Sequence, residues 1–140
     1  DKQHYSRYYP KRLPAEVLYD AVQRMADATS AFADLPPGTR AVQLPDDSFN
    51  ETSYFLTVFG RPESSSACEC ERSCDASLAQ SLHLFNSKEI QQALSAPTGR
   101  AAELAAQLPA NDEQNIRALY ELAYSHPPEP QDLALAMNDL

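Results

Sequence analysis

The chain has 140 residues, which is the length of one ordinary domain and enough for a buried core. Lys and Arg number 11 against 20 Asp and Glu, so the net charge is -9, the wrong sign for a domain that binds nucleic acid through its phosphates. No apolar run approaches the roughly 20 residues of a transmembrane segment. Eleven prolines against three glycines disfavour the glycine-rich turns of hairpins and phosphate-binding loops, so the composition predicts an acidic, helical protein.

The first half of the chain predicts two helices separated by an irregular crossing. Pro14 suits the first turn of a helix over residues 14–27. Its apolar positions follow one another at three- and four-residue spacing: Leu13, Val17, Leu18, Ala21, Val22 and Met25. After a turn at Pro36-Pro37-Gly38, residues 41–45 predict a short extended run. A second helix is expected over residues 49–59, with Gly60 as its C-terminal stop.

Residues 61–76 have no helical periodicity and predict an irregular central loop that contains the three cysteines. A third helix is expected over residues 76–86, where Ser77 and Gln80 have the spacing of a capping box. Four positions supply the apolar stripe of this helix: Leu78, Ala79, Leu82 and Phe85.

The last third of the chain predicts four more short helices. Ser87 is expected to begin a helix that ends at Leu94, and Thr98 one that ends at Leu108. Asn111 or Asp112 begins a further helix, whose apolar face consists of Ile116, Leu119, Tyr120 and Ala123. The prolines of segment 127–130 end that helix and begin the last one, with an apolar side that consists of Leu133, Ala134, Met137 and Leu140. The predicted fold class is therefore all-α, with six or seven short helices joined by proline-punctuated loops.

The cysteine loop is the one place where reactive or ligating residues are dense. Cys68, Cys70 and Cys74 follow a C-x-C-x3-C spacing, and with His83 they could form a structural Cys3His zinc site. C-x-C is tighter than the usual zinc knuckle, so we keep three further hypotheses: one disulfide with a spare thiol, small semi-buried residues in a loop with no special chemistry, and a redox pair of neighbouring thiols. The chain lacks C-x-x-C-H, so it is not expected to attach a c-type haem itself, and no other cofactor is predicted in it.

Charged residues beside the cysteines define a candidate functional loop. It consists of Arg61, Cys68, Cys70, Glu71 and Arg72. An ion pair of Glu71 with Arg72 that fixes the loop is the preferred role, because partly buried arginines are commonly structural. The serines at 64–66 lack the G-x-S-x-G pattern of a nucleophile elbow, so a serine hydrolase is not supported.

The start of the chain combines tyrosines with basic residues, a composition favoured at protein interfaces. The predicted interface consists of Tyr5, Arg7, Tyr8, Tyr9, Lys11 and Arg12. Because the sequence begins at Asp1 without Met or a targeting signal, we expect one helical domain over residues 1–140 that is a fragment of a longer protein.

Several segments together resemble a known family. They are HYSRYYPKRLPAE from His4, LPPGTRAVQLPD from Leu35, FGRP at 59–62 with CECER at 68–72, LAQSLHL from Leu78, and the region from Leu119-Tyr120 to Pro127-Pro128. In this order they resemble the C-terminal domain of unknown function in large secreted, planctomycete-type proteins associated with cytochrome c. The CECER segment after FGRP is the most specific part of the resemblance.

The resemblance implies an exported, periplasmic or extracellular parent protein, with haem in another domain and a cytochrome c domain as a partner. Export would permit a disulfide such as Cys68–Cys70. The leading hypothesis is a non-catalytic helical module that packs on or completes that parent. The alternatives are a structural zinc module and part of an oxidoreductase that works with a c-type cytochrome on carbohydrate, in which Arg40, Arg61 and Arg72 bind an anionic or polyhydroxylated substrate.

Overall fold

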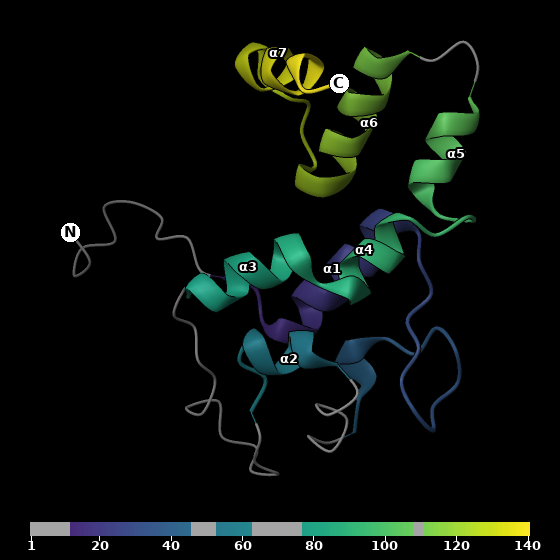
Figure 1. The fold of residues 1–140 in the computed structure, drawn as a ribbon, viewed down its shortest axis with the longest axis vertical. Helices are drawn as coiled ribbons and strands as arrows, with labels where there is room; N and C mark the ends of the chain where they lie inside the picture. The colour runs from purple at the N-terminus through teal and green to yellow at the C-terminus, as the bar shows by residue number, and fades with distance from the viewer. Residues whose placement is uncertain (1–11, 46–52, 63–76, 108–110) are drawn as a thin grey trace, which may run out of the picture. The chain divides into compact units, whose positions relative to one another are not determined.

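The computed structural model describes residues 12–45, 53–62, 77–107 and 111–140. Within these ranges the chain forms seven α-helices and one short 3-10 helix and contains no β-strand, which confirms the all-α prediction (Figure 1). The helices are α1 (Ala15–Ala26), η1 (Ala41–Gln43), α2 (Tyr54–Val58), α3 (Leu78–Asn86), α4 (Lys88–Leu94), α5 (Arg100–Ala106), α6 (Asp112–Tyr124) and α7 (Pro130–Asn138). No helix in the described ranges is both long enough and apolar enough to span a bilayer.

The chain divides into two compact units. The first contains residues 1–20 and 30–86, and the second contains residues 21–29 and 87–140. Helix α1 therefore contributes its first half to one unit and its second half to the other. The expectation of a single helical domain over residues 1–140 stays a prediction.

Aromatic side chains form the core of the first unit. Phe55 and Leu56 of α2 are fully buried. The Tyr19 ring of α1 lies 5.5 Å from the rings of both Phe32 and Phe55, measured between centroids, and Phe55 stacks on Phe59 at 4.3 Å. Rings at these separations combine a large apolar burial with favourable edge and offset contacts. Helix α2, although only five residues long, is held by these contacts rather than by helix propensity.

Helix α1 lies where the sequence predicts it, but its buried face differs from the predicted one. Leu13 and Val17 are 47% and 40% exposed, whereas Glu16 and Tyr19 are buried. Tyr19 offers a larger apolar area than an aliphatic residue, and the three-residue spacing places Glu16 beside it on the same face. Tyr19 therefore determines which side of α1 faces the core, and Glu16 is buried because it lies on the same side.

The extended run predicted at 41–45 is wrong, because residues 41–43 form the 3-10 helix η1. The Asp20 carboxylate of α1 accepts hydrogen bonds from the backbone N–H groups of Ala41, at 2.6 Å, and Val42, at 3.3 Å. Free N–H groups at a helix start require acceptors, and a carboxylate is a strong one. Asp20 is 21 residues away from Ala41, so the local sequence pattern does not reveal this stabilisation of η1.

The capping box predicted at the start of α3 is confirmed. The Gln80 N–H donates to Ser77 Oγ at 3.3 Å, and the Ser77 N–H donates to Gln80 Oε1 at 3.2 Å. The Gln80 amide also donates through Nε2 to the carbonyl of Val58 at 3.1 Å, which links α3 to the end of α2. One glutamine thus caps its own helix and attaches it to the neighbouring one.

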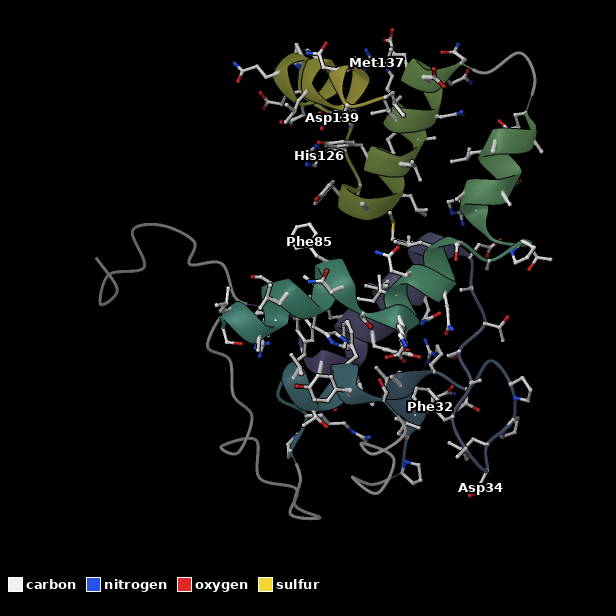
Figure 2. All side chains as sticks on the ribbon, viewed as in Figure 1. Phe32, Asp34, Phe85, His126, Met137 and Asp139 are labelled. Carbon is white, nitrogen blue, oxygen red and sulfur yellow. The ribbon has the colours of Figure 1, made fainter. Side chains whose placement is uncertain are left out.

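The predicted apolar stripe of α3 is exposed rather than buried. Leu78, Leu82 and Phe85 are 75%, 52% and 78% exposed, while Gln80 is buried. Figure 2 shows Phe85 projecting from α3 on the side away from α2. The contacts of Gln80 with Val58 and of His83 with the α2 rings orient the polar side of α3 toward α2, so its aliphatic side faces outward.

Short polar caps begin the helices of the second unit. Ser87 Oγ accepts from the Ile90 N–H at the start of α4, and Asn111 Oδ1 accepts from the Gln114 N–H at the start of α6, as predicted. The predicted cap at Thr98 is wrong, because Gly99 is the N-cap of α5. There Arg100 Nε donates to the carbonyl of Met25 at 2.9 Å, which satisfies an acceptor at the end of α1.

Helices α6 and α7 pack on each other in the second unit. Desolvation raises the pKa of Tyr120 on α6 above its ordinary value, and the negative charge of Asp132 on α7 raises it further. The predicted inner side of α7 is partly wrong, because Ala134, Met137 and Leu140 are exposed and only Leu133 of the four is partly covered.

The close approach of α5 to the end of α1 predicts that Gly99→Ala destabilises the protein. A Cβ atom at position 99 would lie 2.9 Å from the backbone carbonyl oxygen of Ala26, which cannot move without disturbing α1. We expect a loss of about 1–3 kcal/mol in the free energy of unfolding, measured by urea titration. Ala101→Ser, on an exposed position of the same helix, is the control and should change little. Equal midpoints for both variants would contradict the packing.

Candidate functional site

Arg61 is placed by the end of α2. Gly60 has a φ of 79°, and its N–H donates to the Thr57 carbonyl at 3.0 Å, while the Arg61 N–H donates to the Leu56 carbonyl at 2.9 Å. These two bonds form a Schellman motif, which requires a left-handed residue that glycine supplies without strain. The predicted helix stop at Gly60 is thereby confirmed, and it brings the Arg61 side chain back toward α1.

Arg61 forms a buried ion pair with Glu16 in the first turn of α1. The distance from Arg61 Nε to Glu16 Oε1 is 3.5 Å, and the two side chains are only 8% and 11% exposed. Arg61 Nη2 also donates to the carbonyl of Leu44, just after η1, at 3.4 Å. The guanidinium group therefore joins the start of α1, the end of η1 and the end of α2.

An arginine suits this position because its planar group can donate in several directions at once, which a lysine ammonium does less rigidly. Removing both charged groups from water costs free energy, and the attraction between the two opposite charges offsets part of that cost. Removing either side chain would take the opposite charge away from a group that has little access to water. The pair thus fixes the relative register of three backbone segments rather than adding a large net stability.

The ion pair lies in the same unit as an aromatic cluster that contains His83. The His83 ring of α3 lies 5.4 Å from Tyr54, 5.7 Å from Phe55 and 6.4 Å from Phe59, all with edge-type geometry. The guanidinium carbon of Arg12 lies 5.6 Å from the Phe59 ring centroid, within the range of a cation–π contact. Arg12 and His83 therefore both contact the Phe59 ring at the end of α2.

His83 Nε2 is buried and has no hydrogen-bond partner in the described part of the chain. Its surroundings are aromatic carbon rather than oxygen, which is an unusual environment for a ring nitrogen. Among the described residues no three His, Cys, Asp or Glu side chains converge as metal ligands. The zinc hypothesis stays a prediction, because Cys68, Cys70 and Cys74 lie outside the described residues.

The structure accounts for three of the residues singled out from the sequence and for Arg40. Arg61 is buried in the ion pair, His83 is in the aromatic cluster, Arg12 is on Phe59, and Arg40 is exposed just before η1. The others lie outside the described residues: Tyr5, Arg7, Tyr8, Tyr9, Lys11, Cys68, Cys70, Glu71, Arg72 and Cys74. Their assignment to an interface, a disulfide or the candidate loop stays a prediction.

Sequence reasoning missed both carboxylates that organise the site. Glu16 and Asp20 lie four residues apart on α1 and contact Arg61 and η1. The available signal was their spacing around Tyr19, because an acidic residue that shares a helix face with a buried ring needs a partner. The pattern could show that a partner is required but not which of the chain's basic residues supplies it.

The buried pair predicts strong energetic coupling between Glu16 and Arg61. Glu16→Gln and Arg61→Met should each cost about 3–5 kcal/mol in the free energy of unfolding, because each removes the opposite charge from beside a buried charged side chain. The double variant should lower the free energy of unfolding by clearly less than the sum of the two single variants. Urea titration of the four proteins gives the coupling. In the exposed Glu113–Arg117 pair of α6, where the closest distance is 2.7 Å, the matched change Glu113→Gln should cost less than about 1 kcal/mol. Additive single and double effects at residues 16 and 61 would contradict a buried pair.

The environment of His83 predicts that its nitrogen contributes no stability. His83→Phe keeps an aromatic ring against α2 and removes the unpartnered nitrogen, so we expect stability to rise by roughly 1 kcal/mol. His83→Ala removes the ring and should cost several times more. Chemical denaturation of both variants tests this. A His83→Phe protein that is less stable than the unaltered chain would show that Nε2 makes a favourable contact.

Comparison with known proteins identifies a family for the chain but no individual related protein. No curated protein matches the chain, and no solved structure matches it. Residues 1–140, the whole length given, match the family PSD1, described as a protein of unknown function (DUF1553). Because this match covers residues 1–140, the chain belongs to the PSD1 (DUF1553) family.

Proposed function

We propose that residues 1–140 form a non-catalytic helical module that completes a larger exported protein by packing against its other domains. Membership of a family of unknown function is compatible with this role. The observation that carries the proposal is the orientation of Arg61. Its side chain is 8% exposed, pairs with Glu16 and donates to the Leu44 carbonyl, so these guanidinium N–H groups bind within the protein interior.

The oxidoreductase alternative needs Arg61 as a substrate ligand. A cation that binds an anionic or polyhydroxylated substrate must present its donors to solvent, whereas Arg61 is buried beside a carboxylate. Arg40 is exposed just before η1, where its backbone N–H donates to Gln43 Oε1 at 3.0 Å. The geometry therefore favours a structural role for Arg61.

Exposed apolar side chains support the packing role. Besides the α3 stripe, Tyr54 of α2 is 67% exposed, and Leu135 of α7 is 64% exposed. A contiguous row of exposed apolar side chains, such as the one on α3, is typical of a surface that contacts another protein. The basic tyrosine segment that ends at Arg12 is proposed as a further contact. From the family resemblance, the parent is proposed to be exported and to carry haem in a separate cytochrome c domain, with no cofactor in residues 1–140.

The role of Arg61 can be tested against Arg40 as a matched control. If Arg61 is structural, Arg61→Ala lowers the urea midpoint and weakens the helical circular dichroism signal, at a cost of about 3–5 kcal/mol. Arg40→Ala, on the surface, changes stability by less than about 0.5 kcal/mol. If Arg61→Ala in the longer parent leaves the fold and the midpoint unchanged while a turnover is lost, the proposed role is wrong and the enzyme alternative is supported.

A further inference from the structure

We draw no further inference here: the strongest candidate, the surface patch formed by the Tyr120, Tyr124 and His126 rings at the C-terminal end of α6, carries nothing because no feature of the described part of the chain shows what covers it.

Discussion

The buried pair of Glu16 and Arg61 is the constraint on which the first unit depends. It connects the first turn of α1 to Arg61 in the turn that follows α2 and, through the Leu44 carbonyl, to the end of η1. Two local devices make the contact possible. The Schellman turn at Gly60 directs Arg61 inward, and the Asp20 carboxylate fixes η1 so that Leu44 lies within reach. Three segments far apart in the sequence are thereby held in one arrangement.

The pair also explains why the aromatic core and the exposed stripe occur on opposite sides of α3. Tyr19 and Glu16 enter the interior together, and the α2 rings that pack on Tyr19 also contact His83. Once His83 and Gln80 face α2, the helical period forces the leucines of α3 to the other side. The exposure of Leu78 and Leu82 is therefore a consequence of how the interior is built.

Local signals predicted the elements of this fold well. Ser77 with Gln80, Ser87 and Asn111 begin helices as expected, because a capping side chain bonds to backbone only two or three residues away. Gly60 ended α2 for a similar local reason.

The buried side of each helix was predicted less well, since Leu13, Val17 and Leu82 have apolar spacing yet are exposed. Contacts between distant residues, such as Asp20 with η1 and Glu16 with Arg61, decide which side of a helix is buried. The residue spacing along one helix does not reveal these contacts. For the candidate site, the sequence singled out Arg61 as part of the central loop, but its pairing with Glu16 came from the fold.

Hydrogen exchange of backbone amides tests most directly whether the pair holds the first unit together. In the Glu16→Gln protein, the account predicts that the amides of Phe59, Arg61 and Leu44 lose protection together, because the end of α2 and the end of η1 are both held through Arg61. Protection that falls only in the first turn of α1, with Phe59, Arg61 and Leu44 unchanged, would contradict it.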